Sequence, residues 1–448
     1  MSLETLKSYD REQSLTFLGG APYVFHCHHY NLFHDQTIDD ALGDTVGLEV
    51  RTRAAKNAFR AVLESISAAE HATTPVERVQ LARELFPYMG LGAIEIAASA
   101  FEGSARSASL HYGYAWREKY GSRVKRSLPV DAVTAGFLAA LTEVAYALPQ
   151  GTAWAVEEEC VAAKAAECRF RIERKPVGGW NEPVPVVVDE ATVRRHVAPP
   201  ARGLDEDRIA RIGAGLTDFM KAVRGDERGL VQAFSVFVAA QLASYYNESM
   251  FEMVTRLEAQ SPKLAPTAEE LAREAGRVCV FNTFGNVLLS PEWEALVGPL
   301  SSDPADIVSF CLAIARGLGF GHWHLHEYEP KKRMVLRASS SYEVPYYLAR
   351  FGKAERPRGY FLGGSAMAIA VLAEQVDWAS KPKLDGEAYQ RLLGGGKPLA
   401  RVEQTLRVKA NARLEAGDPP WREAAVDLGL PCSGATRNPS SKEKLPVR

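Results

Sequence analysis

Residues 128–172 read LPVDAVTAGFLAALTEVAYALPQGTAWAVEEECVAAKAAECRFRI, and this stretch decides the fold that we expect. A helix of small apolar residues is followed by a hairpin-like run with two cysteines, Cys160 and Cys168, and a carboxylate just before them, Glu157. Asp131, directly before the helix, could supply a fourth ligand. Thiolates and carboxylates on either side of a short loop predict a zinc-type site. A zinc site with four protein ligands is structural rather than catalytic. The alternative is a pair of thiols that binds no metal.

This stretch resembles the 4-vinyl reductase domain family in two segments, PVDAVTAGFLAAL and VEEECVAAKAAECRF. The family usually shows Pro-Val-Cys, a glycine-centred helix of small residues, and Glu-x-x-Cys followed by Cys-x-Phe. Asp131 stands where the family has its first cysteine. The resemblance implies an α+β module with a cavity for a hydrophobic ligand, and structural zinc held by the ligands of this motif. The residues that fit the pattern are Pro129, Val130, Gly136, Glu157, Cys160, Cys168 and Phe170.

A weak internal duplication predicts two such modules. APYVFHCHHYNLF and GRVCVFNTFGNVLL are matched as β-prone runs, and two later segments share a helix, a Gly-x-Gly stop and a strand. No cysteines stand at the corresponding place of the second copy, so we expect it to be degenerate. The predicted fold is α+β, with two similar domains, each an antiparallel sheet packed by helices, joined by a helical segment. The expected divisions are an extension (1–19), domain one (20–175), a linker (176–204), a helical connector (205–262), domain two (263–430) and a disordered tail (431–448).

A second metal site is predicted in the histidine-rich run VFHCHHYNLFH. If the run is a strand, His26 and His28 share one face while Cys27 and His29 share the other. Two imidazoles at this spacing can hold zinc or an iron-type ion. His28, Tyr30 and His34 would then be the candidates for proton transfer. The alternative is a strand edge of hydrogen-bonded histidines.

An aromatic cluster follows the first strand pair of the predicted domain one. In the expected fold these side chains border the cavity and could stack on, or hydrogen-bond to, a flat ligand. The alternative is that they are core residues only. The cluster comprises His111, Tyr112, Tyr114 and Trp116.

The overall composition excludes several classes of protein. The chain has 448 residues, a formal net charge of -2 and 46% hydrophobic residues, which is typical of a globular protein without a nucleic-acid-binding charge excess. No export signal and no membrane-length apolar run is visible, and the six cysteines are sparse, so we expect a cytoplasmic protein with reduced thiols. Three functions remain: binding of a small hydrophobic or aromatic molecule, a metal-dependent enzyme (an oxidoreductase or a biosynthetic one), and an assembly protein. The central helices could form a homodimer interface.

Overall fold

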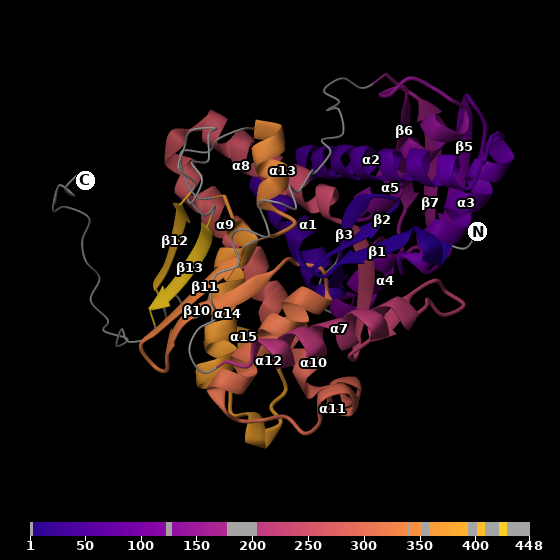
Figure 1. The fold of residues 1–448 in the computed structure, drawn as a ribbon. Coiled ribbons are helices and arrows are strands. Elements are labelled where there is room, and N and C mark those ends of the chain that lie inside the picture. The colour runs from indigo at the N-terminus through magenta and orange to yellow at the C-terminus, as the bar shows by residue number, and fades with distance from the viewer. Residues whose placement is uncertain are drawn as a thin grey trace, which may run out of the picture.

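The computed structural model describes residues 3–121, 128–176, 204–338, 340–351, 358–392, 401–407 and 421–427. Within these ranges the chain is an α+β protein with three antiparallel sheets packed by helices (Figure 1). The predicted α+β class with antiparallel sheets is therefore confirmed. The expected linker lies almost wholly outside the described residues, as do the expected tail and Cys432.

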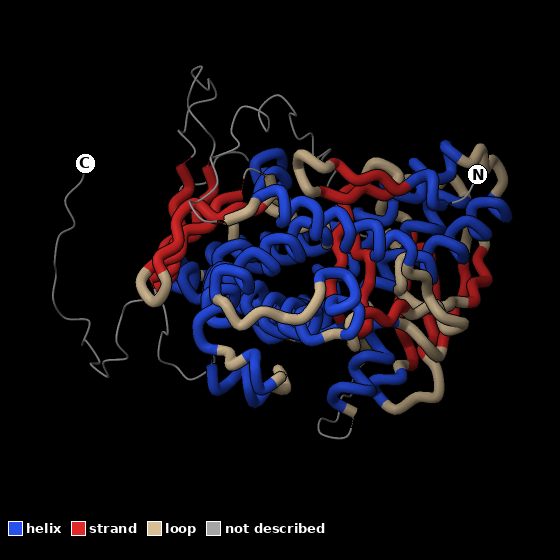
Figure 2. The backbone as a smooth tube through the Cα atoms, turned by 60° about the horizontal axis from the view of Figure 1, so that its bottom comes forward, coloured by secondary structure: helices blue, strands red, loops and turns tan. Residues whose placement is uncertain are grey.

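Two four-stranded sheets lie toward opposite ends of the molecule, with helices between them (Figure 2). A central five-stranded sheet takes strands from both halves of the chain, in the order β1-β2-β3-β9-β8. Its strands are β1 (Lys7–Asp10), β2 (Leu15–Leu18), β3 (Ala21–Cys27), β8 (Val231–Ala233) and β9 (Val236–Leu242). The other two sheets have the orders β4-β5-β7-β6 and β10-β11-β13-β12. Their strands are β4 (Glu95–Ala98), β5 (Glu102–Ser107), β6 (Ala153–Glu159), β7 (Cys168–Arg174), β10 (Trp323–Glu329), β11 (Arg333–Ala338), β12 (Arg401–Arg407) and β13 (Trp421–Asp427).

The helices fill the space between the sheets. Those of the first half are α1 (His28–Leu42), α2 (Asp44–Ala69), α3 (Pro75–Tyr88), α4 (His111–Tyr120) and α5 (Ala132–Ala145). Those of the second half are α7 (Glu206–Ala222), α8 (Ala243–Gln260), α9 (Ala265–Cys279), a π-helical turn (Val280–Phe284), α10 (Gly285–Leu289), α11 (Pro291–Val297), α12 (Pro304–Gly317), α13 (Val344–Phe351), α14 (Tyr360–Gln375) and α15 (Gly386–Leu392). Among the described residues, no helix has both the length and the apolar character needed to cross a bilayer.

The two predicted Gly-x-Gly stops are confirmed. Helix α3 ends before Gly90 and Gly92, and α12 ends before Gly319 and Gly321; in each case a strand follows. All four glycines have positive φ, at 76°, 112°, 86° and 120° in chain order. Glycine reaches this region without the steric cost that a side chain brings, so the motif reverses the chain between helix and strand.

The histidine-rich run is a strand only as far as Cys27, so the predicted strand reaching Asn31 is wrong. Strand β3 pairs with β9 up to Cys27 opposite Val238, and helix α1 begins at His28. The buried face of α1 is largely polar, with Asn31, His34 and Asp35 inside. Helical periodicity is read from apolar residues. Because this helix buries polar ones, the usual signal was absent.

Two further sequence interpretations are corrected. The run around Cys279, read as a strand, lies in α9 and the π-helical turn, where Val278 to Phe284 are all buried. A helix buried on all sides carries no alternation to distinguish it from a buried strand. The segment 205–262, read as a helical connector, contains the hairpin of β8 and β9 between α7 and α8. Its turn residues, Phe234 and Ser235, have φ of 53° and 62° without the usual Asn-Gly signal, so sequence reasoning missed the turn.

Helices α2 and α5 pack at unusually close range through Gly136. A Cβ there would lie 2.5 Å from Thr52 O and 2.6 Å from Lys56 N. We expect Gly136→Ala to lower the free energy of unfolding by about 1–3 kcal/mol, because backbone atoms cannot move aside as a flexible side chain would. This loss opposes the better helix propensity of alanine. Chemical denaturation measures it.

The matched control is Gly386→Ala, at the first residue of α15. A Cβ there meets no atom within 4 Å, so the variant should be neutral or slightly stabilising. Equal stability of the Gly136→Ala and wild-type proteins would contradict the close packing of α2 on α5.

Candidate metal and ligand site

Three of the predicted metal ligands meet at the end of the β6–β7 hairpin. Glu157 lies near the end of β6, Cys160 precedes a short 3-10 turn, and Cys168 is the first residue of β7. One ligand atom from each side chain lies within 4.8 Å of the other two, and all three residues are buried. This group could hold a metal such as zinc, as predicted.

Asp131 lies beside this group without belonging to it. Its Oδ1 accepts a hydrogen bond from Thr134 N at 3.0 Å and so caps helix α5. Glu157 Oε2 accepts from the backbone N–H groups of Val130 and Asp131, at 3.1 and 2.9 Å, which ties the hairpin to the start of α5. Asp131 Oδ2 and Glu157 Oε1 are buried and have no hydrogen-bond partner in the described part of the chain. Asp131 as fourth ligand remains a prediction.

The acidic groups of this site perturb one another. Burial, with Glu157 nearby, raises the pKa of Asp131 to about 7. Burial and the neighbouring Cys160 raise the pKa of Glu157 well above its usual range. The hydrogen bond from Cys168 Sγ to Cys160 Sγ lowers the pKa of Cys160 to about 6 and raises the pKa of Cys168. So many acidic groups cannot all ionise in one dry site, whereas a bound cation favours their charged forms. The donor set therefore fits zinc.

Helix α4 lies directly over the cysteine pair. A Cβ on Gly113 would lie 2.9 Å from Val161 Cγ2 and 3.1 Å from Cys168 Sγ. Only a residue without a side chain allows this approach. The helix that carries the predicted ligand-binding side chains therefore packs directly against the candidate metal site.

The predicted ligand-binding side chains meet partners from the second half of the chain. Gln241 Nε2 donates to Tyr112 Oη at 3.1 Å, and Arg228 Nη1 donates to Tyr114 Oη at 2.9 Å. Trp116 is buried, with Tyr120 4.7 Å away between ring centroids. Sequence reasoning missed Gln241 and Arg228 because it read their segment as a helical connector.

His111 is, with Tyr112, one of the two most deeply buried of the four predicted residues. It is 1% exposed, and its Nε2 lies 2.9 Å from Asn31 Nδ2 of α1. Its Nδ1 is buried and has no partner in the described part of the chain. Burial, with His28 nearby, lowers the pKa of His111 to about 3, so the ring is neutral. Sequence reasoning did not use one signal: the Tyr-Asn pair in HHYN, which contains Asn31, recurs in YYN, which contains Tyr246.

A buried ion network adjoins this region. Arg51, 1% exposed, donates to both oxygens of Asp39 at 2.7–3.1 Å and to Asp35 Oδ2 at 2.9 Å. Burial opposes ionisation of Asp35, but the Arg51 charge and the hydrogen bonds from His34 and Tyr245 outweigh it and lower the pKa of that carboxyl. A cavity of about 10 Å³ lies beside the network, lined by Leu32, Asp35, Gln36, Asp39, Arg51, Tyr112, Trp116 and Val130.

Similarity to known proteins is found among solved structures. No family model matches the chain, and neither does any curated protein. The chain is similar to the phenol-responsive sensory domain of the transcription activator PoxR, crystallised with phenol. The similarity has 15% sequence identity and a TM-score of 0.33, and it covers 38% of this chain and 86% of that one.

The histidine-rich segment does not gather around one point. His26 Nδ1 lies 3.2 Å from Cys279 Sγ, among aromatic rings of the second half. His28 instead accepts from Phe237 N at 3.2 Å, and its ring lies 4.0 Å from that of His29. Cys27 Sγ contacts Thr283 Oγ1 at 2.7 Å. Within the described residues, no group of three metal-ligating atoms includes one from these three histidines or Cys27. The second metal site remains a prediction.

The remaining proton-transfer candidates are core residues of α1. Tyr30 stacks on His26, with ring centroids 3.9 Å apart, and is 3% exposed. His34 is fully buried; its Nδ1 lies 3.0 Å from Asp35 Oδ1 and its Nε2 lies 3.4 Å from Ser249 Oγ. Both side chains are held in fixed hydrogen-bonded or stacked positions, which is the usual state of buried polar groups.

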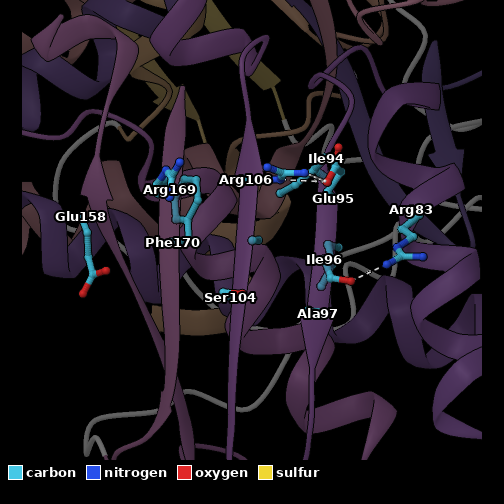
Figure 3. A pocket seen from close by; sticks show the side chains of 11 residues that line it. Arg83, Ile94, Glu95, Ile96, Ala97, Ser104, Arg106, Glu158, Arg169 and Phe170 are labelled. Carbon is cyan, nitrogen blue, oxygen red and sulfur yellow. Dashed lines mark hydrogen bonds and ion pairs between the residues drawn. The ribbon is translucent and has the colours of Figure 1, made fainter. Parts of the chain in front are cut away.

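A larger groove, of about 610 Å³, lies along β4, β5 and β7 beside α3 (Figure 3). Arg106 pairs with Glu95 across the strands at 2.7 Å, and Arg83 donates to the carbonyl of Ile96. None of the predicted ligand-binding residues lines it. Arg169 pairs with Glu159 and Glu167, and Glu158 pairs with Arg171. The charged side chains of the groove therefore all have partners, as on an ordinary solvated sheet face.

Proposed function

We propose that the first half of the chain is a zinc-braced module that binds a small aromatic or otherwise hydrophobic molecule carrying at least one polar atom. The metal holds the β6–β7 hairpin against α5 and supports α4. Helix α4 presents the ligand-binding side chains. This function keeps the expectation drawn from the 4-vinyl reductase resemblance.

The donor set supports zinc at Glu157, Cys160 and Cys168, with Asp131 as the fourth ligand. Two thiols with carboxylate oxygens suit zinc, and the buried, unpartnered oxygens of Glu157 and Asp131 are the atoms that a cation would engage. The site is closed, so the metal would be structural. Zinc there stabilises the fold and need not take part in any reaction.

The observation that supports ligand binding is that His111 Nδ1 is buried and has no hydrogen-bond partner in the described part of the chain. A buried imidazole nitrogen without a partner costs roughly 1–3 kcal/mol. A ligand whose polar atom reaches this nitrogen recovers that cost. Tyr112 and Trp116 of the same helix supply aromatic surface for the rest of the ligand. The cavity of about 10 Å³ beside them holds about one water, so side chains here must move to admit an aromatic ring.

We infer further that the two halves arose by duplication, with a different match for the first segment, APYVFHCHHYNLF, from the one that the sequence suggested. Both outer sheets have the same strand order, and Gly364 approaches the backbone of α9 as Gly136 approaches that of α2. Tyr246-Asn247 stands near the start of α8 as Tyr30-Asn31 stands near the start of α1. Strands β3 and β9 pair antiparallel at the centre, which is the arrangement that a two-fold axis between them would produce.

Binding of a panel of small aromatic compounds tests the proposed function, beginning with phenol. We expect at least one compound to raise the thermal midpoint of the wild-type protein, and to raise it further as its concentration increases, because a ligand that binds only the folded state stabilises it. His111→Phe should abolish that shift. Ser104→Ala, in the groove on the outer sheet, should retain it. A panel without effect on the wild type, or a shift that His111→Phe retains, would contradict ligand binding at α4.

A further inference from the structure

A chain of three side chains connects the second half to the proposed ligand site. Tyr246 Oη of α8 donates to Asn31 Oδ1 of α1 at 2.5 Å. Asn31 Nδ2 then lies 2.9 Å from His111 Nε2 of α4. The three residues are 2%, 0% and 1% exposed, so no water competes for these bonds.

The chemistry of an amide gives this chain a direction. The Asn31 side chain has an acceptor end and a donor end. Because Tyr246 donates to the oxygen, the NH₂ group faces His111, and an NH₂ group can only donate. His111 Nε2 must therefore accept, and a neutral imidazole that accepts at Nε2 carries its proton on Nδ1. The buried, unpartnered nitrogen of His111 is thus a donor.

We propose that Tyr246 is a specificity-determining residue of the α4 ligand site, which sets through Asn31 the tautomer of His111 and so selects ligands that offer a hydrogen-bond acceptor. The inference rests on the proposed function and deepens it. Tyr246 is a positioning residue, because it acts through Asn31 and His111. A ligand that offers only a donor would meet another donor at His111, and a buried unmatched pair should weaken binding roughly 10- to 100-fold.

The surroundings of Tyr246 hold its ring in place beside Asn31. Rings of His26, Tyr30 and His34 surround it, with centroids 4.8, 5.2 and 5.1 Å away. The corresponding amide of the second half, Asn247, donates to the carbonyl of Tyr342 at 2.8 Å. A carbonyl has no second protonation form, so that amide cannot control a tautomer. Asn247 therefore has no counterpart of the control that we propose for Asn31.

Nitrogen-15 NMR of the full-length protein, labelled on histidine, tests the tautomer without any ligand. We expect the wild-type protein to carry the His111 proton on Nδ1. Tyr246→Phe removes the donor, frees the amide to rotate and should give a mixed or Nε2-protonated ring. Tyr245→Phe is the matched control: its hydroxyl donates to Asp35 instead, at 2.5 Å, so the His111 tautomer should not change.

Asn31→Asp provides a second variant should Tyr246→Phe fail to fold. A carboxylate only accepts, so it requires a proton on His111 Nε2 and should invert the tautomer. A wild-type ring protonated on Nε2, or a tautomer that neither variant changes, would overturn the proposal.

Two probes of similar size then test selectivity. Pyridine at pH 8 offers an acceptor, whereas pyrrole offers only an N–H donor. We expect the wild type to bind pyridine at least about 10-fold more tightly, and Tyr246→Phe to reduce that ratio toward one. Equal affinities in the wild type would overturn the selectivity. Failure of both probes to bind would count against the proposed function, and the NMR result separates that failure from an error in the tautomer.

Discussion

The double variant Cys160→Ser/Cys168→Ser will be isolated without zinc, whereas the wild-type protein will carry about one zinc per chain. Thiolate is the preferred zinc ligand in this site, and serine hydroxyls bind zinc far more weakly. Removing the metal removes the binding free energy from the folded state. At free zinc 1,000-fold above its Kd, the loss of stability should be about 4 kcal/mol. Metal analysis by mass spectrometry and chemical denaturation measure the two effects.

Cys311→Ala is the matched control for this experiment. Cys311 is fully buried in α12 of the second half, so the variant loses a buried thiol without touching the candidate site. It should keep the full zinc content even if packing loss lowers its stability. Retention of zinc by the double variant, or failure of metal-free wild type to take up added zinc, would rule out the cysteine site.

Arg51→Met should be the most destabilising single substitution in the ion network of α1 and α2. It leaves the carboxylates of Asp35 and Asp39 buried without their shared cation. Breaking a buried pair by removing one partner costs about 3–5 kcal/mol. Urea denaturation at pH 7 measures this loss.

The pH dependence of the Arg51→Met loss has a definite sign. In the wild type, the lowered pKa of Asp35 gives stability that is present above the unfolded-state pKa and is lost as pH falls through the folded-state pKa. Without Arg51, burial dominates and raises the pKa of both carboxyls, so the folded variant takes up protons as pH falls. The destabilisation relative to wild type should therefore be smaller at pH 5 than at pH 7.

Arg171→Met is the control for the loss of a paired arginine. Arg171 pairs with Glu158 and Glu173 on an exposed sheet face, where its side chain is 48% exposed. Ion pairs of this kind contribute little, so the change in stability should stay within about 0.5 kcal/mol. If Arg51→Met is no more damaging than Arg171→Met, or equally damaging at both pH values, the buried network does not have the role assigned to it.

The candidate metal group was predictable because it is local. Glu157, Cys160 and Cys168 stand on one hairpin, so a single turn brings them together whatever the rest of the chain does. The Gly-x-Gly stops were predictable for the same reason, since the left-handed backbone that they adopt is a property of glycine itself. Asp131 lies beside this group because it caps the start of helix α5.

The partners of the ligand site were not predictable in the same way. Gln241 reaches Tyr112 of α4, and Tyr246 reaches Asn31 of α1, only because β9 pairs with β3 across the centre of the molecule. The strand and hairpin assignments there failed because Phe234 and Ser235 form the turn without a turn signal. The start of helix α1 at His28 was missed because its buried face is polar.

The sequence by itself determined the α+β class, the hairpin that gathers a carboxylate with two thiols, and the chemistry that those groups prefer. Only the tertiary structure decided that His111 faces an amide from α1, and that a tyrosine from the other half orients that amide. The physical reason is the sequence separation over which the deciding interactions act. Turns and ligand spacing are set by neighbouring residues, whereas the direction of a buried hydrogen bond depends on every group that excludes water from it.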